Sequence, residues 1–388
     1  MSLQTDRNLT KAIIMQLVHS LESNVDNTTL KINRFWRYFY KCYGLQFSNE
    51  NANATKAQKC YFTIFLASFV LTNALATTQC LLDVITNGAI ENICILISTL
   101  AYWTQSFTCL VVLYKRQNQF SKCINQLLKN ITVAHKKRVW KFLLLIMAAS
   151  TAVIVFSSTA DVVIDFPNDP LNFLWKINSF YYWFTVILTE TTKILFLLFC
   201  ILLSFNFECL MTDVETSIAS FSSFTEKIML NHHYNYYTNI HWINEVNKLF
   251  DSLLGVWIAC DIVSVVVSLH FVIQNTISLS LTTVYSLRTI WLLLLMYKYA
   301  ALVKEKAQLT AIAITKLTDS QVNNYNPQVF NLTGQRNVNN WNCNLLIHDL
   351  SLSSVGINVS GYFIMTKGSI LTLVGTLITY AIVMFQTK

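Results

Sequence analysis

Glycine, proline and charged side chains are all scarce in this sequence. Its 388 residues include 8 glycines and 3 prolines, and only 12% of them are charged. Soluble proteins carry about 25% charged residues, so the low charge excludes an ordinary soluble domain. Transporters with helices broken at the substrate site use more glycine and proline. The two shortages together favour a membrane protein built from continuous helices.

The amino terminus lacks the pattern of a cleavable signal peptide, an early apolar run after a basic start. Residues 1–30 are polar, so we expect the first membrane span to act as its own signal. No glycine-rich phosphate loop, nucleophile–base pairing or basic nucleic-acid patch stands above chance. We therefore predict that the chain is not an enzyme, needs no cofactor and binds no nucleic acid.

Metal-ligand spacing is also missing, although the chain has 10 cysteines. No Cys-x-x-Cys or Cys/His spacing occurs, and we expect the cysteines to be mostly reduced. His232, His233 and His241 lie among tyrosines but lack the i,i+4 spacing of a helical zinc site. We predict that they sit in a solvated turn between helices and bind no metal.

What the sequence does contain is a series of apolar stretches long enough to cross a membrane, in a chain that is 54% hydrophobic. About 20 apolar residues span the hydrocarbon core. Counting on that basis predicts seven spans, at 61–82, 90–114, 139–160, 177–206, 247–274, 280–303 and 361–386. A further helix near 340–358 should lead into the last span.

The distribution of charge orients these spans. The segment 115–141 holds eight cations and no Asp or Glu, which places it in the cytoplasm. The N-terminus and the long segments 207–246 and 304–349 are then also inside, and the C-terminus is outside. None of the Asn-x-Ser/Thr sequons falls in the short outside loops, so we expect no N-glycan. A metabotropic seven-helix receptor, the main alternative, needs the opposite orientation.

Two further segments suggest helices at or beyond the inner membrane surface. The basic aromatic run around Phe35–Tyr40 predicts an interfacial helix at the inner headgroups, or a cytosolic turn of the first span. Residues 204–250 carry apolar side chains at helical spacing, including Leu210 and Val214. Spans 4, 5 and 6 should therefore continue into the cytoplasm and pack together, within one subunit or as an assembly platform between subunits.

Ionisable residues inside the spans mark a candidate site. Glu190 in span 4 and Asp261 in span 5 lie at membrane depth, where an unpaired charge costs several kcal/mol. Arg288 in span 6 is the partner we expect for them. Such a group is either part of a ligand site or a structural ion pair inside the bundle.

Aromatic residues lie near these charges. Tyr285, Arg288 and Trp291 are spaced to share one face of span 6, and Trp291 and Arg288 are the strongest ligand-binding candidates. The other candidates are Tyr182 and Trp183, beside Tyr181, in span 4 and Trp103 and Gln105 in span 2. Aromatic walls with a few polar groups suit a small organic ligand. The alternative for any one of them is an aromatic belt at the outer headgroups.

The final apolar stretch carries a polar stripe. At about 100° per residue, one line of the helix collects Gly368, Thr372, Gly375, Thr379 and Gln386, with Ile382 on the same side. Lipid offers such a stripe no hydrogen-bond partner. It either lines a pore repeated around a symmetry axis or forms a small-xxx-small packing seam. Gln386 favours the pore, because a packing seam does not need a long amide at the membrane edge.

The same stretch resembles the C-terminal signature of insect gustatory receptors, which is Thr-Tyr, five hydrophobic residues and Gln-Phe. Here Thr379 and Tyr380 precede five apolar residues and Gln386. Thr387 departs from the family's Phe, and Thr366 stands where an acidic residue is usual. The resemblance implies a tetrameric, ligand-gated, non-selective cation channel with the last helices around a central pore. Odorant receptors share this topology and are the nearest alternative.

The sequence thus predicts an all-α, seven-transmembrane protein with its N-terminus inside. Its parts are a cytoplasmic segment 1–60, a ligand-binding bundle 61–303, an anchor segment 304–360 and a pore helix 361–388. By resemblance, it is a taste receptor in the plasma membrane of sensory neuron dendrites, opened by a sugar or a bitter compound. Its other partners are permeating cations, membrane lipids and further subunits, as a homotetramer or a heteromer with related receptors.

Overall fold

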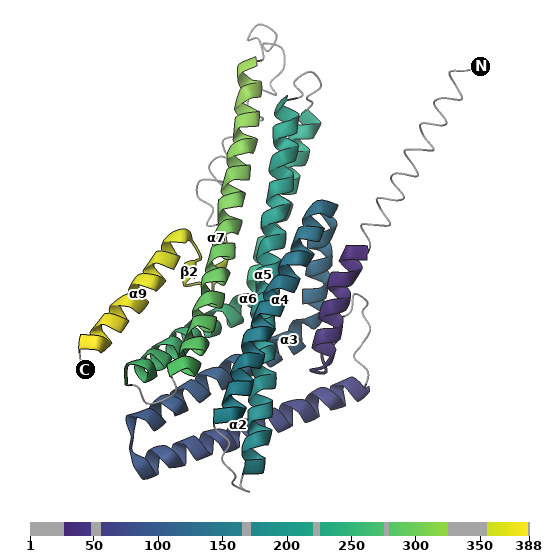
Figure 1. Cartoon of the computed structure of the whole chain (residues 1–388). Helices are drawn as coiled ribbons and strands as arrows, with labels where there is room; N and C mark the ends of the chain where they lie inside the picture. The colour runs from purple at the N-terminus through teal and green to yellow at the C-terminus, as the bar shows by residue number, and fades with distance from the viewer. Residues whose placement is uncertain are drawn as a thin grey trace.

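The fold is known from a computed structural model, which describes residues 27–47, 56–164, 172–219, 226–274, 279–324 and 355–386. A first helix covers residues 27–41. The elements that follow are α2 (Lys56–Asn87), α3 (Ile90–Lys129), α4 (Val133–Ile164), α5 (Asn172–Ala219), α6 (Glu226–Gln274), α7 (Leu279–Asn324), β1 (Asn358–Val359), β2 (Phe363–Ile364) and α9 (Lys367–Gln386). Figure 1 shows long helices gathered in one bundle, with α9 inclined along one side.

Six helices in the described part of the chain, α2 to α7, are long and apolar enough to cross a membrane. Each contains the span expected for it and extends beyond that span at one or both ends. The seventh predicted span corresponds to α9, which has 20 residues. At 1.5 Å per residue, α9 still matches the ~30 Å hydrocarbon core. The prediction of an all-α multi-pass membrane fold is confirmed.

The first helix packs into the core of the bundle, which the aromatic pattern alone did not predict. Trp36 and Tyr40 are almost completely buried, and the Tyr40 hydroxyl donates a hydrogen bond to Thr192 Oγ1 of α5 at 3.4 Å. Burial raises the pKa of Tyr40 well above its usual value, so this hydroxyl stays protonated. The aromatic run is helical, and its rings point into the bundle. Trp36 stacks on Tyr40, and Tyr43 stacks on Phe184 of α5.

The helices α5, α6 and α7 extend far beyond the lengths that a membrane requires, as the amphipathic pattern predicted. Leu210 and Val214 of α5 and Ile243 and Val246 of α6 are buried at these extensions. Figure 1 shows the extensions rising together above the rest of the bundle. We expect this end to lie in the cytoplasm.

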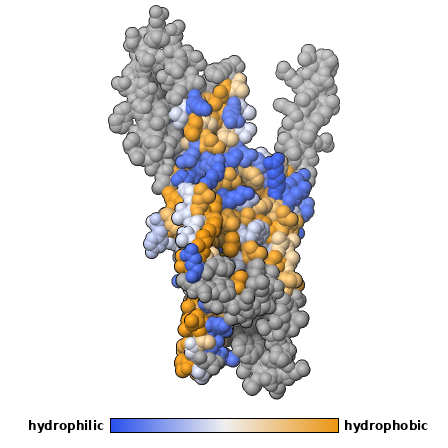
Figure 2. All heavy atoms as spheres, turned by 60° about the vertical axis from the view of Figure 1, so that its left-hand side comes forward, coloured by the Kyte–Doolittle hydropathy of each residue, from blue (hydrophilic) through white to orange (hydrophobic). Residues whose placement is uncertain are grey.

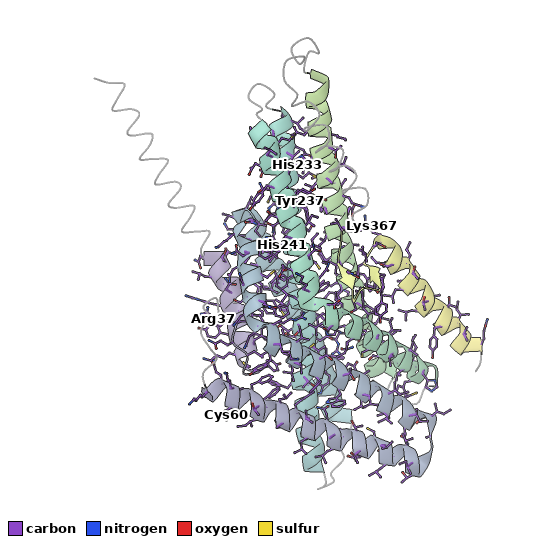
Figure 3. All side chains as sticks on the ribbon, turned by 180° about the vertical axis from the view of Figure 1, so that it is seen from behind. Arg37, Cys60, His233, Tyr237, His241 and Lys367 are labelled. Atoms are coloured by element: carbon purple, nitrogen blue, oxygen red, sulfur yellow. The ribbon has the colours of Figure 1, made fainter. Side chains whose placement is uncertain are left out.

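Two segments predicted as loops are helical. The cationic segment 115–141 belongs to α3 and α4, which are separated only by a short turn at residues 130–132. The three histidines lie inside α6, where His233, Tyr237 and His241 follow one another along the helix (Figure 3). Both segments were predicted as loops because they are rich in polar residues. Long helices outside the membrane carry such residues on their solvent faces.

The last helix begins six residues later than predicted. Residues 361–366 are not helical, because β1 and β2 form a small antiparallel hairpin that pairs Val359 with Phe363. Ser360 and Gly361 have positive φ values of 48° and 80°, the left-handed geometry of a tight turn. Of the helix predicted near 340–358, the part at 340–354 lies outside the described residues, and the rest belongs to the approach to β1 and to β1 itself.

Thr366 ends the hairpin segment and caps α9. Its hydroxyl accepts a hydrogen bond from Ser369 N at 3.2 Å, and Ser369 Oγ accepts one from Thr366 N at 2.8 Å. This reciprocal pattern is a capping box, which satisfies two amide groups at the helix start. Thr366 therefore fixes where α9 begins.

The described surface divides into a polar and an apolar part. Figure 2 shows hydrophilic side chains gathered in a band across the middle of one face, with mostly hydrophobic side chains below it. The exposed apolar residues of α2 and α3 include Ile64, Leu71, Ile85 and Ile90. Such a surface suits lipid contact, and we expect the band to mark the inner headgroup level.

Candidate functional site

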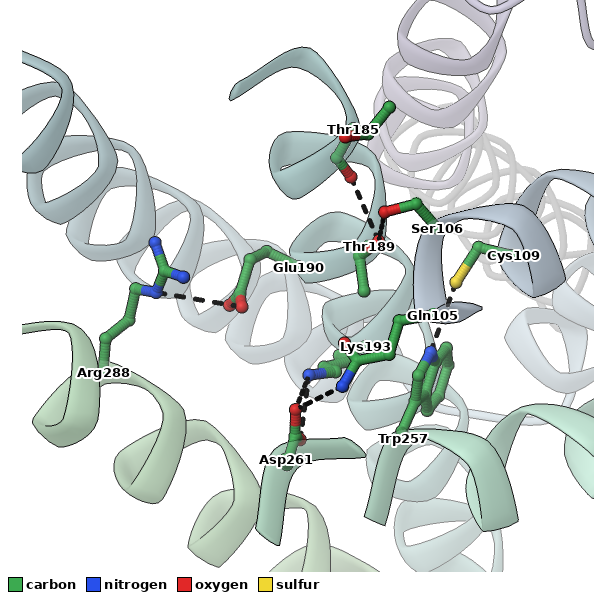
Figure 4. Close-up of polar contacts among 10 residues, drawn as sticks. All are labelled: Gln105, Ser106, Cys109, Thr185, Thr189, Glu190, Lys193, Trp257, Asp261 and Arg288. Atoms are coloured by element: carbon green, nitrogen blue, oxygen red, sulfur yellow. Dashed lines mark hydrogen bonds and ion pairs between the residues drawn. The ribbon is translucent and has the colours of Figure 1, made fainter. Parts of the chain in front are cut away.

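Charged side chains from three helices come together in the interior of the bundle. Glu190 and Lys193 lie one turn apart on α5, Asp261 lies on α6 and Arg288 lies on α7, and all four are at least 95% buried. Gln105 of α3 joins them and is equally inaccessible. Figure 4 shows that Lys193 faces α3 and α6 while Glu190 faces α7.

The tightest contact in this group joins Lys193 to Asp261. Lys193 Nζ lies 2.7 Å from Asp261 Oδ1 and 2.9 Å from Oδ2. Gln105 Nε2 donates a hydrogen bond of 2.8 Å to Asp261 Oδ1. Because desolvation of a charge is expensive, such a buried pair depends on good geometry and additional hydrogen bonds. Here the carboxylate receives both, so the pair fixes α3, α5 and α6 relative to one another.

The second ion pair is longer. Arg288 Nε lies 3.9 Å from Glu190 Oε1, at the outer limit of an ion pair. The sequence-based expectation is confirmed for Glu190 and wrong for Asp261, whose partner is Lys193. With two cations and two carboxylates, the whole group is electrically neutral when all four are ionised.

Polar residues of α3 and α5 continue the cluster. Ser106 Oγ lies 3.1 Å from Thr189 Oγ1, and Trp257 Nε1 donates a hydrogen bond of 3.2 Å to Cys109 Sγ (Figure 4). These contacts place a hydrogen-bonded layer within an otherwise apolar bundle, where each bond is sheltered from water.

Three buried polar atoms near this layer have no hydrogen-bond partner in the described part of the chain. They are Trp103 Nε1 on α3, Glu190 Oε2 on α5 and Ser264 Oγ on α6. An unsatisfied buried donor or acceptor costs about 1–3 kcal/mol. A small molecule with hydrogen-bonding groups would therefore gain from reaching them.

The structure places the aromatic candidates for ligand binding in different environments. Trp183 is buried against Ile154 and Val186, and Trp103 is half-buried and packs on the core. Trp291 is 41% exposed while Arg288 is 5% exposed, so within one subunit only Arg288 lies in the interior. The two residues lie about 60° apart around α7, and the edge of the bundle falls between them. The structure describes the backbone but not the side chains of Tyr181, Tyr182 and Tyr285.

Sequence reasoning missed Lys193, the most deeply buried cation in the group. A signal was present: Lys193 follows Glu190 by three residues inside an apolar run. Each ionisable residue in a span implies a partner. Two carboxylates at membrane depth with only Arg288 to neutralise them therefore implied a second cation.

The polar stripe of α9 is not buried within the subunit. Gly368, Thr372, Gly375, Thr379 and Gln386 are all exposed, as is Ile382 at 51%. The opposite side holds the helix in place, with Leu373 buried and Ile370 and Leu377 packed on the core. Among the residues that the structure describes, the stripe has no packing partner, so it is available to water or to another subunit.

A set of hydrogen bonds ties the start of α9 to α6. Asn247 Nδ2 donates to the Gly356 carbonyl at 3.0 Å, and Asn247 Oδ1 accepts from Asn358 N at 3.1 Å. Ser360 Oγ donates to the Asp251 carbonyl at 2.5 Å. We call these contacts of Asn247 and Ser360 the hairpin clamp. They join the hairpin to the same helix that carries Asp261.

The clamp is rigid because the hairpin is packed as well as hydrogen-bonded. Ile357, Val359 and Met365 are buried, and Met365 N donates to the Ile357 carbonyl at 2.9 Å. A side chain at Gly356 would meet Ile364 at 2.6 Å, so only glycine fits there. On the other side, Lys367 Nζ lies 2.7 Å from Glu305 of α7. The hairpin before α9 is thus held to α6 by buried packing and hydrogen bonds, while its contact with α7 at Lys367 is exposed.

Comparison with known proteins agrees with this architecture. No family model matches the sequence, and no curated protein matches it. Among solved structures, the chain is similar to the insect olfactory receptor OR5 from Machilis hrabei, with a TM-score of 0.70 and 12% identity over 93% of this chain and 100% of that one. The same receptor in complex with eugenol gives a TM-score of 0.67 and 14% identity over 95% and 99% of the two chains. The protein described here therefore has the fold of an insect olfactory receptor.

Proposed function

We propose that this protein is a chemosensory receptor of the gustatory type that acts as a ligand-gated, non-selective cation channel. The observation that carries the proposal is the exposed polar stripe of α9, on a helix whose other face is fixed to the bundle. A spanning helix cannot present such a stripe to lipid without cost. In a tetramer, whether homomeric or heteromeric, four stripes would face a shared aqueous path.

The ligand site in this proposal is the hydrogen-bonded layer around Glu190, Arg288, Asp261 and Gln105, reached from outside the cell. Trp103 and Trp183 supply aromatic surface beside it. Because the cluster is neutral as a whole, it suits a ligand that offers hydrogen bonds more than one that brings a net charge. A sugar or a bitter compound has such groups.

Gating follows from the connection between this layer and α9. A ligand that draws α3, α5 and α6 together shifts α6, and the hairpin clamp moves the start of α9 with it. The constriction lies near Ile382 and Gln386, where apolar side chains stop ions by dewetting until a small dilation rewets them. The stripe carries no acidic residue, so selectivity for cations rests on the resemblance to gustatory receptors.

An odorant-receptor role is the second candidate. It is favoured by the similarity in fold to an olfactory receptor whose structure has been solved with eugenol. The Thr379–Tyr380…Gln386 run favours the gustatory role. Both roles require the same topology and the same channel, so they differ only in the ligand.

The proposal is tested by expressing the chain alone and recording calcium entry against sugars, bitter compounds and volatile phenols. We expect entry with at least one tastant and no response in untransfected cells. Epitope tags at each end of the chain, stained in unpermeabilised cells, should label the C-terminus and not the N-terminus. Surface-exposed N-terminal tags would contradict the channel topology and favour a metabotropic receptor.

A further inference from the structure

A cavity lies apart from the charged layer, at the end of the bundle that we expect in the cytoplasm. Its volume is about 400 Å³, within the range of small-molecule sites. The turn after α3 and the extensions of α5 and α6 line it, and Asp213 and Tyr234 are exposed at its rim. Its lining is Asn130, Asn206, Cys209, Leu210, Asp213, Tyr234, Asn235, Thr238 and Asn239.

One residue that lines this cavity is largely buried. Asn239 is 6% exposed, and no side-chain hydrogen bond joins it to another residue that the structure describes. Its amide atoms are not among the fully enclosed polar atoms that lack a partner. As a lining residue, Asn239 can offer this amide to a molecule bound in the cavity.

The neighbouring groups offer both donors and acceptors. Asn206 uses Nδ2 to donate to the carbonyls of Leu127 and Leu202, which leaves its Oδ1 as an acceptor. The Asp213 carboxylate forms no ion pair within the described part of the chain, and it adds two further acceptor oxygens. Asn235, Asn239 and Asn130 each supply a carboxamide that both donates and accepts.

These hydrogen-bond donors and acceptors favour one chemical class of ligand. An ammonium ion only donates, so it would leave the carboxamide N–H groups unpaired. A phosphate or carboxylate would be repelled by Asp213, and no Lys or Arg lines the cavity to attract it. A hydroxyl donates and accepts at once, and vicinal hydroxyls match the paired oxygens of a carboxylate. The ring of Tyr234 offers a face for C–H groups.

We propose that this cavity binds a small polyhydroxylated molecule, a monosaccharide or a cyclitol, at the cytoplasmic end of the protein. The site is separate from the ligand layer in the membrane, since the lining residues of α5 and α6 lie at 206–213 and 234–239 rather than at 190 and 261. The proposal concerns binding alone and does not depend on channel activity.

The test is saturation-transfer NMR on the purified full chain in lipid nanodiscs, without sugar-based detergent. The probes are glucose and myo-inositol, with putrescine and inorganic phosphate as comparison solutes. We expect transfer to at least one polyol and none to the other two. Asn239→Ala and Asp213→Asn, on different helices, should each raise the dissociation constant about tenfold, because each removes hydrogen-bonding groups from the lining of the cavity.

Asn244→Ala is the matched control, because Asn244 is exposed on the same helix and does not line the cavity. It should leave polyol binding unchanged. Thermal unfolding of each variant confirms that the protein is folded. Binding of putrescine or phosphate in place of the polyols, or polyol binding that survives both cavity substitutions in folded protein, would overturn the proposal.

Discussion

Replacing Lys193 with alanine should lower the free energy of unfolding by about 3–5 kcal/mol, the usual cost of removing one partner of a buried ion pair. Asp261 would keep only the hydrogen bond from Gln105 and would remain 98% buried. The effect should appear as a marked fall in the melting temperature of purified protein, or as loss of the monodisperse peak after size-exclusion chromatography.

Two variants serve as controls for this result. Lys193→Met combined with Asp261→Leu removes both charges and should recover most of the stability, because no uncompensated charge is left. Lys248→Ala removes an ion pair with Glu245 that is largely exposed, and such pairs contribute little. If the single and the double substitution destabilise the protein equally, the Lys193–Asp261 pair does not have the role described here.

Replacing Asn247 with alanine should reduce the maximum ligand-evoked current about tenfold while the protein still reaches the cell surface. The substitution removes two hydrogen bonds, to the Gly356 carbonyl and the Asn358 amide, and so uncouples the hairpin from α6. A loss of about 1.4 kcal/mol in coupling corresponds to a tenfold shift in an equilibrium. Whole-cell recording, normalised to surface biotinylation, measures the effect.

The control for the clamp is Lys367→Ala, which removes an exposed contact at the same helix start. Lys367 is paired with Glu305, but its side chain is 74% exposed, so we expect currents close to those of the unaltered protein. Single-channel conductance should be the same in all three proteins, because none of these residues lies on the stripe. Unchanged currents in Asn247→Ala at equal surface density would show that the clamp does not transmit gating.

The helical layout was predictable because the length of an apolar run is set by the membrane itself. Glu190, Asp261 and Arg288 were also predictable as a group, since charges at membrane depth are few and need partners. What the sequence did not specify was the pairing. Helical spacing states which residues share a face of one helix, but it does not state which neighbouring helix that face meets.

The errors have the same origin. Trp291 was expected beside Arg288 because their spacing places them on one helix face, but Trp291 is exposed in the single subunit while Arg288 is buried. The aromatic run at Trp36 and Tyr40 resembled an interfacial helix, and only the packing against α5 shows that it is buried. The hairpin before α9 has strands of two residues each, too short to leave a periodic pattern.

The central claim is that the stripe of α9 faces an aqueous path formed with other copies of the chain, and cysteine accessibility tests it most directly. Thr379 is exposed on the stripe, whereas Leu377 packs on the core of its own subunit. A membrane-impermeant, positively charged thiol reagent should block ligand-evoked current in Thr379→Cys and leave Leu377→Cys and the unaltered protein conducting. Equal block of both variants, or full current through a modified Thr379→Cys channel, would contradict the account.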